Sequence, residues 1–292
     1  MDMQIRRNGS YLPEVFMDSL VLSAKYSESI HHLSSHFHDC HQLIYVDSGT
    51  ARFTVSGKSY LAKPGTVVLI SRFEAHSIQI ESRNYHRYSL QIYPEISGYG
   101  TLGGENLLSV LINRPVYFLH AVDMASEPKV RYLMQEMVQE FDSTSAMNGK
   151  MLDLLLFQLL VLLRRSHPEL LPEKTEKLQL VQKIQEQFET NYHEKWTLTD
   201  LAKEHHISPS HLSHLFKQTT GHSVMGYLAS CRIAAAKRCL AETDMEVGTI
   251  VASCGFSDNS NFSRTFREVT GMTPSQFRSK FQKLKPLSSF EN

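Results

Sequence analysis

The sequence has no excess of charge of either sign, because 30 Lys and Arg residues balance 30 Asp and Glu residues in a chain of 292. This balance excludes a strongly basic protein that coats nucleic acid along its whole surface. The sequence also lacks an apolar run of about 20 residues, the length that a membrane-spanning helix needs. The longest run, residues 152–163, contains Asp153 and Gln158 and therefore predicts a buried helix.

Cysteine is scarce and has no metal-binding or redox spacing. The four cysteines are Cys40, Cys231, Cys239 and Cys254. None forms a Cys-x-x-Cys pair, and so few thiols favour reduced side chains in a cytoplasmic protein. The first ten residues lack the long apolar core of a signal peptide. We therefore expect a cytoplasmic protein with no membrane-spanning segment.

What the sequence does contain is an approximate repeat, in residues 198–223 and 247–273. Leu201 matches Ile250 at an offset of 49, whereas the later matches have an offset of 50, so the second copy has one extra residue in its turn. The matches at 50 are Leu212-Ser213 with Phe262-Ser263, Phe216 with Phe266 and Gly221 with Gly271. Each copy predicts a helix-turn-helix, which can place its second helix in the DNA major groove.

The second helix of each copy has a polar face opposite its apolar residues. The polar residues are Ser210, His211, Ser213, His214 and Lys217 in the first copy, and Asn259, Ser260, Asn261, Ser263, Arg264 and Arg267 in the second. Asn and Arg can pair bidentately with adenine and guanine, whereas Lys217 and Arg267 suit phosphates. The alternative is a pair of solvated faces on an ordinary helical domain. Because the repeat, the helix caps and the polar faces recur together, we favour DNA binding.

The segment between the copies predicts one continuous helix over residues 224–240. Such a helix would hold the two units at a fixed separation, which for one DNA face is about 34 Å. Residues 205–285 contain ten Lys or Arg and five Asp or Glu, a local charge of +5. This local excess is typical of a surface that contacts nucleic acid.

Residues 178–282 resemble the DNA-binding domain of AraC/XylS-family transcriptional regulators. The matching motifs are LxxLA at 198–202, ISPSHLSHLFK at 207–217, GFSDNSNFSRTFR at 255–267 and TGMTPSQFR at 270–278. The family places two recognition helices in successive major grooves. By position, the resemblance implies base contacts from Ser210, Ser213, His214, Asn259, Ser260 and Arg264. It also implies a dimer, a small-molecule effector that is often a sugar, and activation through RNA polymerase.

The N-terminal part has strand character from about residue 15 to residue 95. Residues 43–46, 51–55 and 66–70 are short runs separated by turn-forming residues, which predicts a small antiparallel barrel or sandwich. Helical periodicity begins near residue 126, and a second helix over 148–165 is apolar around most of its circumference. This second helix belongs either to a domain core or to a dimer interface.

The motif His36-x-His38-(x)3-Gln42-(x)6-Gly49 resembles the first motif of the cupin superfamily. That motif has Glu at the position of Gln42, and the later His76 resembles the histidine of a second motif. Three interpretations remain: structural histidines, an effector pocket without metal, and a metal site for Zn, Fe, Mn or Ni. A neutral amide is a poor replacement for a carboxylate ligand. We therefore expect no metal and no cofactor, with His36, His38, Gln42 and His76 in an effector pocket.

The sequence predicts an α+β multidomain protein: a cupin-like β-barrel followed by helices, then an all-α domain with two helix-turn-helix motifs joined by a linker helix. The expected parts are a barrel over 1–125, a helical dimerisation segment over 126–166, a linker over 167–177 and a DNA-binding domain over 178–285. We expect a regulator of transcription that binds double-stranded DNA, and not an enzyme. The alternatives are a metal-dependent cupin enzyme with an accessory helical domain, and a module that only binds protein.

Overall fold

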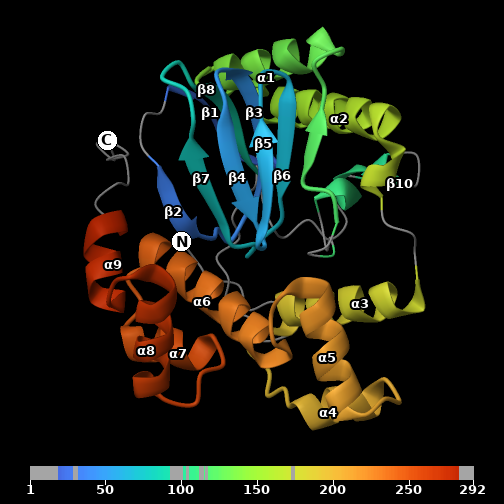
Figure 1. Ribbon diagram of the computed structural model, residues 1–292. Helices are drawn as coiled ribbons and strands as arrows, with labels where there is room; N and C mark the ends of the chain where they lie inside the picture. Colours follow the sequence, from blue (N-terminus) through green and yellow to red (C-terminus); the bar gives the residue numbers. More distant parts are fainter. Residues whose placement is uncertain are drawn as a thin grey trace, which may run out of the picture. The chain divides into compact units, whose positions relative to one another are not determined.

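The computed structural model describes residues 19–28, 32–92, 101–102, 105–111, 115, 118–171 and 175–282. The chain divides into two compact units, with the main boundary between Gln179 and Leu180. The N-terminal unit is rich in β-structure and the C-terminal unit is helical (Figure 1).

Two antiparallel sheets form most of the N-terminal unit (Figure 1). One has the strand order β1-β8-β3-β6-β11 and the other β2-β7-β4-β5, and β9 and β10 form a separate hairpin-like pair. The strands are β1 (Val21–Glu28), β2 (Leu33–His36), β3 (His41–Ser48), β4 (Ala51–Val55), β5 (Lys58–Ala62), β6 (Thr66–Ile70), β7 (His76–Ile80), β8 (His86–Ile92), β9 (Thr101–Leu102), β10 (Glu105–Asn106) and β11 (Ala121–Asp123).

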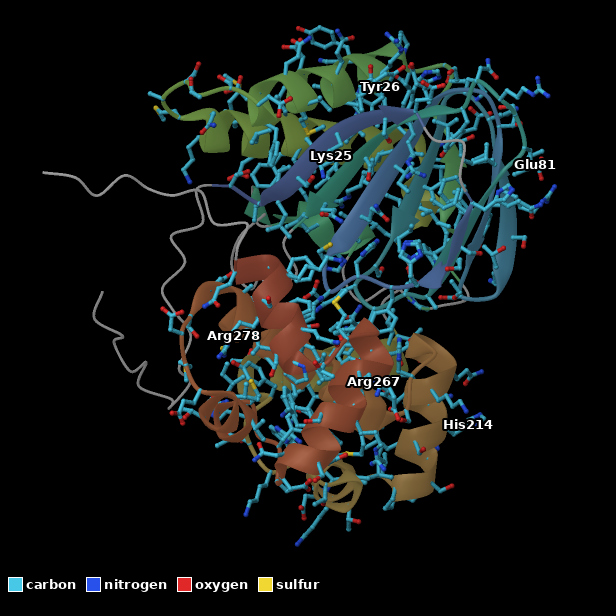
Figure 2. The ribbon with its side chains drawn as sticks, turned by 90° about the vertical axis from the view of Figure 1, so that its left-hand side faces the viewer. Lys25, Tyr26, Glu81, His214, Arg267 and Arg278 are labelled. Carbon is cyan, nitrogen blue, oxygen red and sulfur yellow. The ribbon has the colours of Figure 1, made fainter. Side chains whose placement is uncertain are left out.

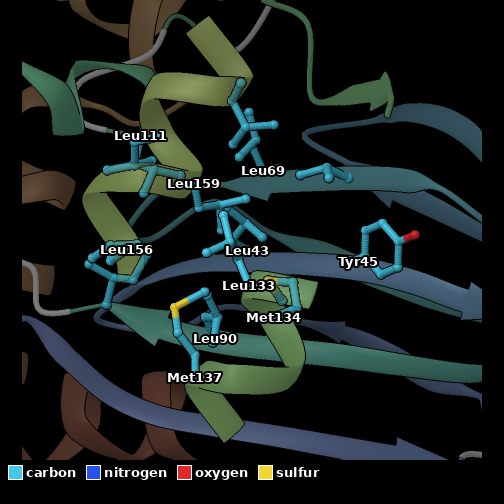
Figure 3. Packing of buried hydrophobic residues seen from close by; sticks show 14 of the residues in the cluster. Leu43, Tyr45, Leu69, Leu90, Leu111, Leu133, Met134, Met137, Leu156 and Leu159 are labelled. Atoms are coloured by element: carbon cyan, nitrogen blue, oxygen red, sulfur yellow. The ribbon is translucent and has the colours of Figure 1, made fainter. Parts of the chain in front are cut away.

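Two helices, α1 (Pro128–Phe141) and α2 (Asn148–Ser166), cover one face of the larger sheet. They follow a short 3-10 helix, η1 (Leu107–Val110), and a second one, η2 (Pro168–Leu170), comes after α2. Figure 3 shows the apolar side chains of the two helices packed against those of β3, β6 and β8. Asp153 fits into the apolar α2 because its carboxylate accepts hydrogen bonds from the Leu20 amide and the Ser19 hydroxyl. These bonds tie α2 to the start of β1.

The centre of strand β3, residues 43–46, is continuously apolar because both faces of its sheet are covered there. Leu43 and Tyr45 belong to the core between sheet and helices, while Ile44 and Val46 belong to the core between the two sheets. Successive side chains of a strand point to opposite faces, and a strand covered on both sides therefore needs a continuous apolar run. By the same alternation, Gln42 lies on the face toward the second sheet.

The C-terminal unit consists of short helices arranged around one long helix, α6. Its helices are α3 (Glu176–Asn191), α4 (Leu198–Glu204), α5 (Pro209–Thr220), α6 (Val224–Glu242), α7 (Val247–Ser253), α8 (Asn259–Thr270) and α9 (Pro274–Phe281). Helix α6 packs against α7, α8 and α9. It carries many alanines and other small residues, which lets neighbouring helices approach it on several sides.

The predicted fold class is confirmed: a barrel-like pair of sheets with two helices precedes an all-α unit with two helix-turn-helix motifs. The predicted strand runs correspond to β3, β4 and β6, and the predicted helix over residues 224–240 corresponds to α6. The four domain limits stay predictions, and residues 172–174 of the expected linker lie outside the described residues. No helix within the described ranges has the length and apolar character to cross a membrane.

Candidate nucleic-acid interface and histidine cluster

The two helix-turn-helix motifs share the backbone geometry of their turns. His206 and Gly255 both have positive φ, at 55° and 79°. One residue later, the amide of Ile207 donates to the carbonyl of Ala202 at 3.0 Å, and the amide of Phe256 donates to that of Val251 at 3.1 Å. The sequence repeat is therefore a repeat of structure, with the same hydrogen bond closing each turn.

Each recognition helix begins with a side-chain cap. The Ser208 hydroxyl accepts from the His211 amide at the start of α5, and the Asp258 carboxylate accepts from the Asn261 amide at the start of α8. Such caps satisfy amides that a helix start leaves without an intrahelical partner. The capping residues Ser208 and Asp258 are 50 positions apart, whereas the turn residues His206 and Gly255 are 49 apart. The second motif therefore has one more residue between turn and cap, and that residue is Ser257.

Apolar residues fix which face of each recognition helix turns outward. Leu212 and Phe216 of α5 and Phe262 and Phe266 of α8 have no exposed surface. The opposite faces therefore point to solvent. Of the predicted DNA-contacting residues, Ser210, His214, Lys217, Asn259, Ser260, Arg264 and Arg267 are exposed and Ser213 is half-buried. Figure 2 labels His214 on α5 and Arg267 on α8.

Asn261 also belongs to the polar face of α8, but it is not among the predicted DNA-contacting residues. The Arg264 guanidinium donates a hydrogen bond from Nη2 to the Asn261 Oδ1 at 3.2 Å. Residues three apart are neighbours on a helix surface, and that spacing is the signal that could have paired them. Asn261 thus favours one orientation of the Arg264 side chain.

Helix α6 connects the two motifs through the half-buried side chain of Arg232. Its guanidinium donates from Nε to the Tyr192 carbonyl and from Nη2 to the Glu194 carbonyl, both at 2.8 Å, and it lies 5.8 Å from the ring centre of Phe256. One side chain therefore contacts the segment before the first motif and the turn of the second. This contact restricts movement of the motifs within the C-terminal unit.

In the N-terminal unit, the structure brings His36, His38 and His76 together as a histidine cluster. One potential ligand atom from each of the three lies within 4.8 Å of the others. His36 and His76 are register partners on β2 and β7, and their ring centres are 4.3 Å apart. The spacing His36-x-His38 predicts proximity of these two, whereas the arrival of His76 depends on strand pairing.

Hydrogen bonds to backbone carbonyls orient two rings of the histidine cluster. The Nδ1 atom of His36 lies 2.7 Å from the Ser34 carbonyl oxygen, and that of His76 lies 2.9 Å from the Glu74 carbonyl oxygen. His76 is almost fully buried, and its Nε2 atom has no hydrogen-bond partner. Burial lowers the pKa of His76 to about 4, so the ring is neutral at physiological pH.

Gln42 and the neighbouring His41 have separate roles. The Gln42 amide donates from Nε2 to the Ser89 hydroxyl at 3.1 Å, and its Oε1 atom is buried without a hydrogen-bond partner. The His41 Nδ1 atom accepts from the Arg72 amide, which makes His41 a structural residue. Of the predicted effector-site residues, the three histidines thus form one cluster. Gln42 follows on β3, four residues after His38.

A buried polar chain of Glu74, His120 and Tyr60 was missed by the sequence analysis. A Glu74 carboxylate oxygen lies 2.8 Å from Nε2 of His120, whose Nδ1 lies 3.1 Å from the Tyr60 hydroxyl. The other Glu74 oxygen accepts from the Ser71 amide. Because Glu74 also supplies the carbonyl that orients His76, this chain supports the histidine cluster. No sequence pattern relates His120 to the others, since 44 residues separate it from His76.

Comparisons with known proteins agree with both parts of the structure. Residues 18–160 match the family model described as AraC-like ligand binding domain, and residues 201–280 match a helix-turn-helix domain. The chain belongs to the AraC family of regulators, and these two matches cover its two units.

The most similar curated relatives include two transcriptional activators. The chain is 31% identical over 158 residues to the activator RhaR of Yersinia pseudotuberculosis, which covers 52% of this chain and 53% of that protein. The chain thus spans about half the length of the curated relatives it matches first. It is 28% identical over 245 residues to the activator RhaS of an Enterobacter species, which covers 83% and 86%.

The fold is similar to that of a solved structure, ToxT of Vibrio cholerae with an unsaturated fatty acid bound. The TM-score is 0.57 at 16% sequence identity, over 89% of this chain and 95% of that chain. At this level of identity the likeness concerns the fold alone.

Proposed function

We propose that this protein is a sequence-specific DNA-binding regulator of transcription. One observation carries the proposal: two helix-turn-helix motifs of the same geometry each turn a polar, capped recognition helix outward. Proteins with this motif place the second helix in the major groove, where its side chains meet the base edges. A chain with two such motifs can contact two successive groove segments without a second subunit.

The exposed residues divide into base-contacting and phosphate-contacting groups. Arg264 suits the guanine edge and Asn259 the adenine edge, because each can form two hydrogen bonds there. Ser210, Ser213, His214 and Ser260 complete the base-contacting group. Lys217 and Arg267 lie near the C-terminal ends of α5 and α8, and we assign them to phosphates, which position the protein without selecting a sequence.

The N-terminal unit binds a small polar effector in this proposal. Tyr88 and Leu90 of β8 face the helices, so Arg87, Ser89 and Gln91 lie on the face toward the second sheet, together with Gln42. The Nε and Nη1 atoms of Arg87 and the Oε1 atom of Gln42 are buried without hydrogen-bond partners. Buried polar atoms are ordinarily hydrogen-bonded, and the hydroxyl groups of a sugar or related metabolite would supply the missing partners.

We assign dimerisation to the outward face of α2 and the residue before it. Met147, Met151 and Leu154 are 74%, 48% and 63% exposed, and they follow one stripe at spacings of four and three residues. The partner that binds this face is a second copy of the same chain, because DNA-binding proteins of this kind gain affinity when two copies bind adjacent sites. The similarity to two activators supports activation of transcription as the outcome of DNA binding. In this proposal the protein acts in the cytoplasm and activates through contact with RNA polymerase.

The test measures binding of the purified full-length chain to DNA from upstream of its own and neighbouring genes. Fluorescence anisotropy at a fixed, near-physiological salt concentration, with excess random DNA as competitor, separates specific from general binding. We expect tight binding that survives the competitor and weakens steeply as salt rises, since phosphate contacts release counterions. Absence of any salt-sensitive binding would contradict the proposal.

A further inference from the structure

The histidine cluster has the geometry of a ligand set rather than of a packed core. Its three rings are tilted by 52° to 76° against one another, so they do not stack face to face. Their potential ligand atoms instead converge to within 4.8 Å. Three imidazoles from two strands and a loop therefore direct nitrogen atoms toward a common point.

The hydrogen bonds of His36 and His76 decide which nitrogen is available. A carbonyl oxygen only accepts, so each Nδ1 beside the Ser34 and Glu74 carbonyls carries the hydrogen. Each Nε2 is then left with a lone pair. Histidines that bind metals in proteins usually donate the hydrogen of the other nitrogen to a carbonyl or carboxylate in this manner.

His76 provides the second, independent observation. It is 1% exposed, and its Nε2 has no hydrogen-bond partner. A buried lone pair without a partner costs free energy, and a bound cation would remove that cost. The Glu74–His120 pair behind it holds the strand end in place, because the Glu74 carboxylate is bonded to His120 and to the Ser71 amide.

Against the expectation of no metal that the sequence gives, we propose that His36, His38 and His76 bind one divalent transition-metal ion, with zinc as the representative ion. Three imidazole nitrogens suit zinc and related metals, whereas magnesium and calcium prefer oxygen ligands. At Zn–N distances of 2.0–2.1 Å, tetrahedral ligand atoms lie roughly 3.4 Å apart. Closing the separations to that value takes small rotations of the half-buried side chains of His36 and His38.

The site leaves one coordination position open. Three protein ligands with a fourth position for water or another ligand are typical of zinc sites that act on small molecules. The three ligands are neutral, and the residue at the glutamate position of the cupin motif is Gln42, which brings no negative charge. The ion therefore keeps its full charge and favours an oxygen ligand. The effector could supply this oxygen, and that part of the inference rests on the proposed regulatory function. Metal binding by the three histidines does not depend on it.

The experiment titrates the full-length, tag-free chain with zinc in competition with a chromophoric chelator. We expect about one equivalent of zinc, and an absorption spectrum of tetrahedral nitrogen coordination when cobalt replaces it. The variants His36→Gln and His38→Gln should each weaken affinity by about a hundredfold or more, because loss of an outer-shell partner alone costs 10–100-fold. The control His86→Gln changes a histidine of the same unit that bonds Ser48 outside the cluster, and should leave affinity unchanged.

Thermal unfolding of each variant shows whether the fold is intact, and DNA binding is measured in parallel. Zinc at less than about a tenth of an equivalent in folded, DNA-binding protein would overturn the metal site and leave the proposed function standing. Equal zinc affinity in wild type, His36→Gln and His38→Gln would also overturn it. Zinc binding in a chain that does not bind DNA would support the metal site and contradict the proposed function.

Discussion

At the scale of single residues, the two turns tolerate different side chains. His206 and Gly255 occupy equivalent positions with positive φ, but a Cβ atom on Gly255 would lie 2.6 Å from the His193 carbonyl oxygen. Glycine at this turn is therefore required by close backbone contact as well as by conformation. Gly271, which ends α8 with φ of 70°, has nothing within 4 Å of such a Cβ.

We predict that Gly255→Ala lowers the free energy of unfolding by about 3 kcal/mol, which combines a left-handed backbone cost of about 1–2 kcal/mol with overpacking. Gly271→Ala is the matched control and should cost only the conformational part, about 1–2 kcal/mol. Urea denaturation, followed through the unfolding transition of the C-terminal unit, measures the loss of unfolding free energy in both variants. Equal losses in the two variants would contradict the assigned contact with His193.

Arg264 and Lys217 should differ in the kind of binding that they support. Arg264→Ala should weaken binding to the specific site by about 1–3 kcal/mol and relax the preference at one base position. Lys217→Ala should weaken binding to specific and random DNA alike and reduce the salt dependence. Anisotropy titrations on both DNAs at two salt concentrations measure this, and identical behaviour of the variants would mean that the assignment of roles is wrong.

Residue identities predicted the two faces of each recognition helix better than they predicted the histidine cluster. Ser208, Phe216 and their counterparts lie on one continuous stretch, so helical spacing alone places them on faces. The orientation of His36 and His76 depends on carbonyls of Ser34 and Glu74 and on pairing between β2 and β7. These are tertiary relations, and no local spacing in the sequence contains them.

At the scale of elements, helices and doubly covered strands were predicted well. Strands β3, β4 and β6 each contain a short run rich in apolar and β-branched residues, which marks them in the sequence. Strand β8 lies within the region of predicted strand character but was not named as a separate run, since it has no continuous apolar stretch: Tyr88, Leu90 and Ile92 face the helices, while polar residues face the second sheet. Short strands with charged or polar positions look like loops until their partners are known.

The cap of α8 makes a prediction about pH. Hydrogen bonds from the Asn261 amide and the Ser257 hydroxyl lower the pKa of Asp258. The folded state then holds the proton less tightly than the unfolded state, so the cap stabilises the fold above the ordinary Asp pKa of about 3.9. That stabilisation is lost as pH falls through the lowered pKa.

Asp258→Ala should therefore lower the Tm at neutral pH, and its difference from wild type should shrink as the pH falls below about 4. Asp258→Asn is the control, because Asn caps a helix about as well without titrating. Thermal unfolding followed by circular dichroism over this pH range measures the three proteins. A gap between wild type and Asp258→Ala that stays constant would contradict the role of the carboxylate.

The outward face of α2 predicts the oligomeric state. Leu154→Glu should raise the dimer dissociation constant roughly a hundredfold, because an interface must then desolvate a charge. Tyr132→Glu is the control, since Tyr132 is 57% exposed but lies on α1 rather than on α2. Light scattering after size-exclusion chromatography measures the mass, and a dimer that survives Leu154→Glu would contradict this interface.

At the scale of the whole molecule, the chain combines a regulatory unit with a DNA-binding unit that has two recognition helices. Composition and the repeat predicted this division into different fold classes. They could not predict the polar inner face of the barrel, because Arg87, Gln42 and Gln91 come from strands that pair only in the folded unit. The sequence therefore indicates the class of protein more readily than the chemistry of its effector.

Helix α6 predicts that the spacing of the DNA target is fixed. It packs against the second motif directly, and Arg232 holds the segment before the first, so the two recognition helices should meet grooves about one DNA turn apart. Inserting half a turn, about 5 base pairs, between the two contacted segments should reduce specific affinity to the level of random DNA. Insertion of a full turn that preserved affinity would show that the connection bends freely.

The extra residue Ser257 and the different polar faces of α5 and α8 make the two halves of the DNA-binding unit unequal. A symmetric dimer with one motif per subunit needs a palindrome, and its bound form looks the same from either direction. A single chain with two unequal motifs needs no palindrome and binds in one orientation. Reversing its target on the chromosome would therefore reverse the order in which α5 and α8 lie relative to the neighbouring gene, so the target sequence also encodes a direction.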